Sequence, residues 1–442
     1  MKMIRTFHPV GQGAFYSEEF FNENGKCVFR VVYDCGSLKS CKLQRNSDGS
    51  LLTRKNIKNR VSGAFSEDHG IDVLFISHLD DDHVNLISRL KPFENHKIRT
   101  VILPLIADEE YVLAGYYLSR SRKVKAGDVV QIINDPKEYF GAHVKVVFVR
   151  PFEDERPRTE DDRRNDVVVN LEDLRDREEI SSMTQISVGR LRGAMGQNPR
   201  WLFVPCNHKP ERYEKFKEAF DKEEFEYNGL KRKGASLGVT MLQNSDFLMQ
   251  NLSKLRNCYK KLPGRFGGNS AINCNSMMLY SGPNSVNCAF RCTVGSNCTH
   301  DSRCEVEGCV FPSIGCLVHY CFDCGLCILP PIPVGIHSVF LRRPGCLYMG
   351  DASVDDAQPM KNFEQYVKCI GTVQMPHHGS LDSFGSGSLP IEGRVCVATY
   401  GERNGFGHPA FAVKRAVAQK GGLWVDVTET EESRFKVEFI VK

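Results

Sequence analysis

The segment from Ser77 to His83 reads SHLDDDH and holds two imidazoles and three carboxylates within seven residues. It ends the apolar run 71–77, which is typical of a buried strand. At a strand end such side chains can converge on one point while the backbone stays extended, and His and Asp are common ligands of divalent metals. The alternative is a charged turn before a helix, whose N-terminus favours acids. The two flanking histidines favour a metal site.

Three later blocks also place polar groups directly after an apolar run. Gly350-Asp351 follows the run 346–349, and His377-His378 follows the run 372–375. His408 lies on the glycine-rich loop 403–409. A single histidine more often packs or caps than binds a metal, but four such blocks in a chain with 13 histidines predict one shared site.

The elements that must position these groups read as short strands with helical segments between them. A strand, loop and helix unit is expected where helical spacing at 84–90 follows the first block. Dense mixed charge from residue 151 to 179 is typical of a solvated loop or exposed helix. The sequence predicts a sheet-rich domain interrupted twice, with strands at 28–33, 71–77, 100–105, 144–149, 201–205, 273–280, 337–341, 346–349, 372–375, 395–400, 423–427 and 434–441.

Composition narrows the class of protein. The chain has 442 residues, of which 41% are hydrophobic and 25% charged, as in soluble globular proteins. The net charge of +4 predicts no strong overall attraction to nucleic acid or to an anionic membrane. The N-terminal segment lacks an apolar signal-peptide core, so a cytoplasmic location is expected. The apolar window 309–329 approaches a membrane span, but Pro312, His319 and Asp323 argue against one, and no membrane is expected.

These blocks, in this order, resemble the metallo-β-lactamase fold, and most closely the soluble hydrolase domain of the competence DNA-uptake protein ComEC. Residues 10–13 (VGQG) and 34–36 (DCG) are similar to the opening blocks of that group. The segment 78–83 is similar to its H-x-D-x-D-H motif, in which an Asp replaces a His of the commoner pattern. The segments 273–279, 350–351, 376–380 (PHHGS) and 407–409 (GHP) match its later blocks.

The resemblance implies an α/β (α+β) fold, the αββα metallo-β-lactamase sandwich, with two insertions, one of them cysteine-rich. It covers roughly residues 1–150, 271–281 and 336–442 and includes no membrane channel. The implied organisation is a first half at 1–150, a charged and helical insertion at 151–270, a core strand at 271–282, a cysteine-rich metal-binding insertion at 283–335 and a second half at 336–442.

The resemblance also implies a centre of two metal ions. His78 and Asp80 would bind one ion, Asp82 and His83 the other, and Asp351 would bridge them. One of His377 and His378, with His378 preferred, would complete a site, and the remaining one or His408 would be a further ligand or general acid. Asp82, His377 and His408 are thus the expected catalytic residues, with Ser380 and Asn404 as substrate-binding candidates. The histidine that usually precedes the bridging Asp has no clear counterpart among His143, His208, His300, His319 and His337.

Two divalent ions lower the pKa of a shared water and stabilise the charged oxygens of a phosphodiester. A nearby imidazole can protonate the leaving group. Asp80 in place of a histidine adds a hard oxygen ligand, which favours manganese or magnesium relative to zinc. The expected cofactors are therefore two Mn or Zn ions, with more activity in manganese than in zinc.

Cysteines cluster in one segment. Ten of the 18 lie between Cys274 and Cys327, and three of these form a C-x-x-C-x-x-C pattern. In a reducing compartment such a cluster favours metal over disulfides, and a structural zinc site is preferred to an iron–sulfur cluster. The alternative role is a zinc-finger-like module that binds nucleic acid or a partner protein. The expected ligands are Cys288, Cys292, Cys298, Cys304, Cys309, Cys316, Cys321, Cys324 and Cys327.

The function favoured by these observations is a two-metal hydrolase of phosphodiester bonds, acting as a DNA or RNA nuclease. The resemblance suggests a stand-alone nuclease or the effector of a multi-protein bacterial defence system. One alternative is a hydrolase of small esters, thioesters or lactams, which would need an apolar pocket near the metals. The other is a protein that binds a partner through its insertions. The expected partner is nucleic acid, and a protein partner is the second expectation.

Overall fold

The structure is a computed structural model of the whole chain. The residues that it describes are 1–38, 42–43, 45, 49–105, 131–132, 135–152, 168–189, 191, 201–207, 218–237, 247, 250–260, 276–284, 290–295, 303–306, 309–312, 343–354, 358–385 and 389–441.

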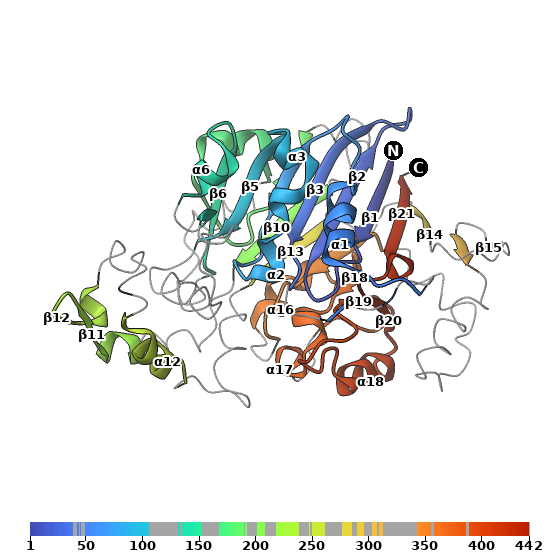
Figure 1. Cartoon of the computed structure of the whole chain (residues 1–442). Coiled ribbons are helices and arrows are strands. Elements are labelled where there is room, and N and C mark those ends of the chain that lie inside the picture. Colours follow the sequence, from blue (N-terminus) through green and yellow to red (C-terminus); the bar gives the residue numbers. More distant parts are fainter. Residues whose placement is uncertain are drawn as a thin grey trace.

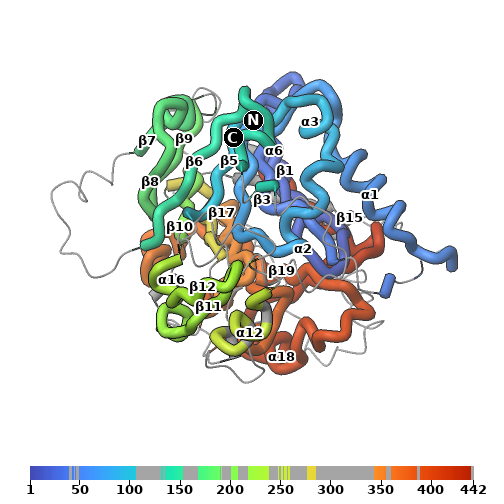
Figure 2. The backbone as a smooth tube through the Cα atoms, turned by 60° about the vertical axis from the view of Figure 1, so that its left-hand side comes forward, coloured from blue at the N-terminus to red at the C-terminus, as the bar shows by residue number. Residues whose placement is uncertain are grey.

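The first large sheet is mixed, and its described strands run in the order β15-β16-β14-β21-β1-β2-β3-β4-β5-β6-β8. Its centre, β3 to β8, is parallel, whereas β1, β2 and β21 pair in antiparallel fashion. The first and last strands pair along their length, so the chain ends lie side by side (Figures 1 and 2). The bounds are β1 (Lys2–Phe7), β2 (Phe15–Phe21), β3 (Cys27–Cys35), β4 (Ile71–Phe75), β5 (Ile98–Pro104), β6 (Lys145–Arg150), β8 (Glu179–Ser181), β14 (Phe290–Gly295), β15 (Arg303–Val306), β16 (Cys309–Pro312) and β21 (Phe435–Val441).

The second large sheet runs in the order β20-β19-β18-β17-β13-β10-β9-β7 over the described strands. The strands β17 to β20 are parallel, and β13 is antiparallel to both β17 and β10. The bounds are β7 (Val169–Asn170), β9 (Ile186–Ser187), β10 (Trp201–Asn207), β13 (Met277–Pro283), β17 (Gly345–Tyr348), β18 (Ile370–Gln374), β19 (Val395–Thr399) and β20 (Leu423–Val427).

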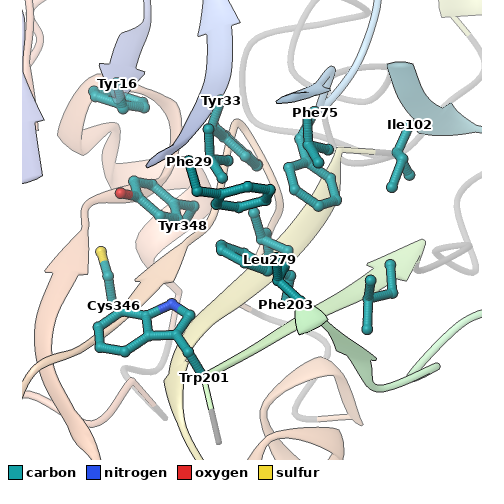
Figure 3. Close-up of a cluster of buried hydrophobic side chains, with 14 of the residues drawn as sticks. Tyr16, Phe29, Tyr33, Phe75, Ile102, Trp201, Phe203, Leu279, Cys346 and Tyr348 are labelled. Atoms are coloured by element: carbon teal, nitrogen blue, oxygen red, sulfur yellow. The ribbon is translucent and has the colours of Figure 1, made fainter. Parts of the chain in front are cut away.

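Alternation along the strands packs the two sheets face to face. In β3, Phe29, Val31 and Tyr33 point into the core between the sheets, while Val32 belongs to the cluster on the outer face. The second sheet contributes Trp201, Phe203, Leu279, Cys346 and Tyr348 to the same core, which Figure 3 shows as interleaved side chains. Because successive side chains of a strand point to opposite faces, alternate residues pack into the shared core and the others pack into an outer layer.

Helices cover both outer faces. The outer cluster of the first sheet contains Ile57 and Val61 of α1 and Phe140 of α6, and that of the second contains Phe384 of α17 and Val413 of α18. Figure 1 shows the two groups of helices on opposite sides of the sheets. The predicted αββα sandwich is confirmed. The helices are α1 (Arg54–Ser62), α2 (Asp81–Val84), η1 (Ile87–Arg89), α3 (Lys91–Glu94), α6 (Pro136–Phe140), η2 (Leu171–Asp176), η3 (Gly234–Ser236), α12 (Leu252–Lys260), α16 (Gln358–Asn362), η5 (Glu364–Tyr366), η6 (Pro376–Gly379), α17 (Leu381–Phe384), α18 (Phe411–Gln419) and η7 (Glu431–Ser433).

The range predicted as a charged and helical insertion, 151–270, contributes strands to both large sheets. β10 pairs with β13 from Trp201 to Asn207, because Trp201 and Phe203 supply apolar side chains to the shared core. A separate hairpin, β11 (Glu224–Tyr227) and β12 (Leu230–Lys233), belongs to neither large sheet.

The backbone expected to stay extended through residues 77–83 is instead helical from Asp81 to Val84. Asp80 occupies the N-cap, and Asp81 and Asp82 lie in the first turn, where the partial positive charge of the helix N-terminus stabilises acids. The expectation of an extended backbone was therefore wrong. The charged turn, which was considered as an alternative to the histidine-bearing site, occurs together with it. The turn places Asp82 and His83 on successive positions beside His78.

A buried ion pair, with its hydrogen-bond partners, lies inside the sandwich. Arg5 places Nε and Nη2 each 2.8 Å from Oε1 of Glu18, and both side chains are almost fully buried. Glu18 also accepts hydrogen bonds from Ser281 and Tyr348, and Ser281 accepts one from Trp201. The set Arg5, Glu18, Trp201, Ser281 and Tyr348 is called the Arg5 network.

The cysteine-rich segment is described only in part. β14 extends the first sheet beside β21, and in the parallel pair of β14 and β16 Cys292 is opposite Cys309. Cys304 lies on β15. The remaining predicted zinc ligands, Cys288, Cys298, Cys316, Cys321, Cys324 and Cys327, and the predicted strand 337–341 lie outside the described residues. Within the part of the chain that the structure describes, no helix is long and apolar enough to cross a membrane.

Candidate metal centre

The candidate site lies where the parallel strands of both sheets end. Ser77 and His78 follow β4, Asp351 follows β17, and His377 and His378 follow β18. The two sheets meet at this edge, since the N–H of Met277 in β13 donates to the carbonyl of Ser77 across 2.7 Å. Ligands at the carboxyl ends of parallel strands can approach one another in this way.

Two glycines allow the backbone to approach closely here. Gly350 has a φ of +53°, and a Cβ at this position would lie 2.9 Å from the Cβ atoms of Ser77 and Ser276. A Cβ on Gly36 would lie 2.3 Å from the carbonyl carbon of Asp82. Any other residue at these positions would push the blocks apart, which gives a physical reason for the glycines of the GD and DCG patterns.

Asp351 is the centre of a first group of side chains. Its Oδ1 lies 3.2 Å from Nε2 of His83, and its Oδ2 lies 3.8 Å from Nε2 of His78 and 3.6 Å from Nε2 of His377. Asp80 adds a second carboxylate near His78, with Oδ2 3.8 Å from Nε2. Asp351 thus lies near three imidazoles, and its role as a bridge between two ions stays a prediction.

A second group joins Asp82, His83 and His378. Nε2 of His378 lies 3.3 Å from Oδ2 of Asp82, and the rings of His83 and His378 are 5.9 Å apart between centroids. One ligand atom each from His78, His83 and Asp351, and likewise from Asp82, His83 and His378, lie within 4.8 Å of one another. His83 therefore belongs to both groups, whereas the resemblance assigned it to one ion.

Hydrogen bonds to the opposite ring nitrogens orient the imidazoles. Nδ1 of His83 lies 2.8 Å from Oδ2 of Asp34, and Nδ1 of His378 donates to the carbonyl of Thr399 across 2.7 Å. Nδ1 of His78 faces the hydroxyls of Ser77 and Ser276 at 2.9 Å and 3.0 Å. Each bond turns Nε2 toward the centre, which is how outer hydrogen bonds fix metal-binding histidines.

The cluster carries excess negative charge for its degree of burial. Burial, with the carboxylates of Asp82 and Asp351, raises the pKa of Asp80 to about 8. Burial opposes the charge on His83, but the carboxylates of Asp351 and Asp34 hold its pKa well above the ordinary value. Burial and the neighbouring His83 lower the pKa of His78 to about 3, so its imidazole is neutral. Without a metal, bound protons offset the negative charge of these carboxylates. A divalent cation in the same place would also offset that charge.

The residues fit divalent metal ions. Nε2 of His78 and Nε2 of His83 are buried, and neither makes a hydrogen bond within the described structure. A buried polar atom without a partner is costly unless a ligand satisfies it. With neighbouring carboxylates, these nitrogens form the mixed N and O donor set that Zn and Mn accept. His78, His83 and Asp351 would hold one ion. Asp82 and His378 would hold the other, and His83 lies within reach of both groups.

The remaining predicted site residues lie around this centre. The rings of His377 and His408 are 5.0 Å apart, and burial with His377 and His378 lowers the pKa of His408 to about 3. Ser380 is buried at the N-cap of α17. The side-chain amide of Asn404 makes hydrogen bonds within its own loop, through its nitrogen and its oxygen, to Gly401, Phe406 and His408. Substrate binding by Ser380 and Asn404 stays a prediction.

Sequence reasoning did not assign roles to several residues that support the site. Asp34 belongs to the DCG block, and its positive φ of 55° marks it in the structure, but a single aspartate gave no signal of its contact with His83. Ser276, in the matched segment 273–279, lies beside His78 and accepts a hydrogen bond from the N–H of Asp351. His143 faces His96 away from the site, while His208, His300, His319 and His337 lie outside the described residues.

Comparisons with known proteins add little to this geometry. No protein-family model matches the sequence, and no curated protein matches it. Among solved structures, the long form of RNase Z from yeast is similar at a TM-score of 0.19 and 13% identity, over 47% of this chain and 27% of that one. The match thus spans about a quarter of the length of the yeast protein, and the function must be argued from the site.

Proposed function

We propose that this protein is a two-metal hydrolase of phosphodiester bonds that cleaves nucleic acid. The observation that supports the proposal is the convergence of His78, His83 and Asp351 with Asp82 and His378 at one edge of both sheets. The order of the motif blocks in the sequence, which resembles that of metal-dependent hydrolases, favours phosphodiester chemistry over metal storage.

Divalent ions held by these residues would supply the Lewis acidity that stabilises charge on a phosphodiester during hydrolysis. The protein contributes orientation. Asp34 fixes Nδ1 of His83, Ser77 and Ser276 face Nδ1 of His78, and the carbonyl of Thr399 accepts from Nδ1 of His378. Nε2 of each ring is therefore committed to the centre before any ligand arrives, so the site is preorganised.

His408 is the residue that we assign to proton transfer. It lies at the side of His377 and is neutral at pH 7, because burial and the neighbouring imidazoles lower its pKa to about 3. A bound phosphodiester anion would raise that pKa and allow the imidazole to protonate the leaving oxygen. In this proposal His377 supports His408, and its own Nδ1 contacts Oγ of Ser383 at 3.1 Å.

The test is cleavage of single- and double-stranded DNA and RNA by the full chain after metal removal and reconstitution with Mn²⁺, Mg²⁺ or Zn²⁺. We expect activity in the wild type, highest in Mn²⁺, and a loss of about 10³-fold or more in Asp351→Ala. His143→Ala is the matched control, since His143 lies outside the site. Equal activity in the wild type and Asp351→Ala on every substrate would remove the proposal.

The same samples distinguish the alternatives. Hydrolysis of small esters, thioesters or lactams without cleavage of any polynucleotide would favour the small-molecule reading. Activity restored by zinc alone would contradict the preference for manganese that Asp80 predicts. A partner in a multi-protein defence system stays a prediction.

A further inference from the structure

Exposed apolar side chains gather on the segments that carry the site histidines. In the described part of the chain, Leu381, Phe406 and Phe411 are 46%, 56% and 67% exposed. Leu381 follows the PHHGS block, and both phenylalanines flank His408 and Pro409. Large apolar side chains exposed on the segments that form a site mark a binding surface more often than scattered ones do. We propose that Phe406 and Phe411 form a stacking surface for the bases of single-stranded nucleic acid, next to the proposed phosphodiester site.

The loop around His408 holds Phe406 in place. Oδ1 of Asn404 accepts hydrogen bonds from the N–H groups of Phe406 and His408, at 3.0 Å and 3.2 Å. The rings of Phe406 and His408 are 5.9 Å apart and inclined by 31°. The backbone of Phe406 is thus ordered beside a site residue while its ring faces solvent. An ordered, exposed ring loses little conformational entropy when a base stacks on it.

Phe411 is fixed by a second set of contacts. The N–H of Ala410 donates to the carbonyl of Gly379 across 3.0 Å, which joins the start of α18 to the loop of His377 and His378. α18 buries Val413 and Val417 against the second sheet, so Phe411, two residues before Val413, points away from that core. Figure 1 shows α17 and α18 side by side below the sheets. Both rings therefore stand on segments anchored at the candidate metal centre.

The charges nearby favour a polyanion. Lys42 and Arg403 face each other in an isolated antiparallel bridge, and both are exposed, as is Arg45. Two acids adjoin this loop, Glu402 and the buried Glu429, whose Oε2 accepts a hydrogen bond from the backbone N–H of Glu402. Basic side chains for phosphates beside exposed aromatic rings are the combination that binds single strands, because stacking needs an unpaired base. The combination argues for single-stranded nucleic acid over an apolar peptide.

The experiment measures binding by the metal-free full chain, so it does not depend on catalysis. The probes are a fluorescein-labelled 12-nucleotide single strand, the same strand with abasic sites in place of its central bases, and the matching blunt duplex, all followed by anisotropy. We expect the single strand to bind the wild type about tenfold or more tightly than either other probe. Phe406→Ala and Phe411→Ala should each weaken single-strand binding by about 5- to 50-fold.

Controls separate stacking from general effects. Phe406→Tyr keeps the ring and should bind within about twofold of the wild type. Leu230→Ala removes an exposed apolar side chain of β12, 61% exposed, and should change nothing. Arg403→Ala should weaken binding of the single strand and of the abasic strand alike, because in this proposal Arg403 binds phosphate, which both strands carry.

The inference rests on the proposed function for its choice of substrate, yet the two fail separately. Equal binding of the abasic and intact strands by the wild type, or unchanged binding in the double variant of Phe406 and Phe411, overturns the stacking surface. No binding of any oligonucleotide also overturns it. Base-dependent binding without metal-dependent cleavage would sustain the surface and remove the hydrolase, whereas cleavage without base dependence would do the reverse.

Discussion

Two buried polar clusters lie in this sandwich, and they differ in how their charges are balanced. In the Arg5 network both oxygens of Glu18 accept hydrogen bonds, and the guanidinium of Arg5 also lies 5.6 Å from the ring centre of Phe439. In the candidate metal centre, Nε2 of His78 and of His83 make no hydrogen bond within the described residues. In the first cluster Glu18 balances the charge of Arg5, although Nη1 and Nη2 of Arg5, like the two Nε2 atoms, make no hydrogen bond in the part of the chain that the structure describes. In the second cluster several carboxylates converge without a matching cation among the described side chains, which is the composition of a site that needs a ligand.

The Arg5 network should therefore be required for folding. Glu18→Ala leaves the charge of Arg5 buried without its partner, and we expect the free energy of unfolding to fall by about 3–5 kcal/mol. Chemical denaturation of the metal-free protein measures the change. Glu438→Ala is the control, because Glu438 forms a partly exposed pair with Lys2 that contributes at most about 1 kcal/mol. Equal losses in the two variants would contradict the larger role assigned to the buried pair.

Asp34 should support the metal centre without binding a metal itself. Asp34→Asn removes the carboxylate that lies 2.8 Å from Nδ1 of His83, and we expect affinity for Mn²⁺ to fall about 10- to 100-fold. Asp72→Asn is a matched control, since Asp72 is also buried and lies 2.6 Å from a histidine, His69, away from the site. Titration calorimetry would measure both, and an equal loss of affinity in the control would show a general structural effect.

We expect Asp80 to lower the free energy of unfolding when no metal is bound. Its raised pKa means that the native state takes up a proton, so its contribution lowers the free energy of unfolding as pH rises from about 4 to about 8. Asp80→Asn should raise the metal-free stability above pH 8 by about 1–2 kcal/mol, since solvent screening of a side chain that is 21% exposed reduces the full effect. The gain should vanish near pH 4. Chemical denaturation in the presence of a chelator at the two pH values measures the gain. An equal gain in the free energy of unfolding at both pH values would contradict this explanation.

The motif blocks were predictable because each is a local pattern at a strand end. The runs before Ser77, Asp351 and His377 all form strands, whereas the αββα order was implied by the resemblance of the motif blocks. The contact of Asp34 with His83 joins residues 49 apart, and that of Ser276 with His78 joins residues 198 apart, so no local spacing reveals them.

The two N-terminal strands show why other elements were missed. β1 carries Arg5 and β2 carries Glu18, and both of these charged residues are buried. A charged residue in a short segment weakens the apolar pattern from which strands are predicted, and its partner is visible only in the fold. β10 was predicted as a strand, but its pairing with β13 spans a long stretch of intervening sequence. The sequence pattern thus indicates strands more reliably than it indicates their partners.

The central claim is that the cluster around Asp351 binds divalent cations, and manganese stoichiometry tests it most directly. The chain is stripped with a chelator, loaded with Mn²⁺, dialysed and analysed for metal, in the wild type and in Asp351→Asn. We predict about two Mn²⁺ per wild-type chain, and fewer than about half an ion in the variant at unchanged secondary structure. Equal manganese content in the two proteins would contradict the account.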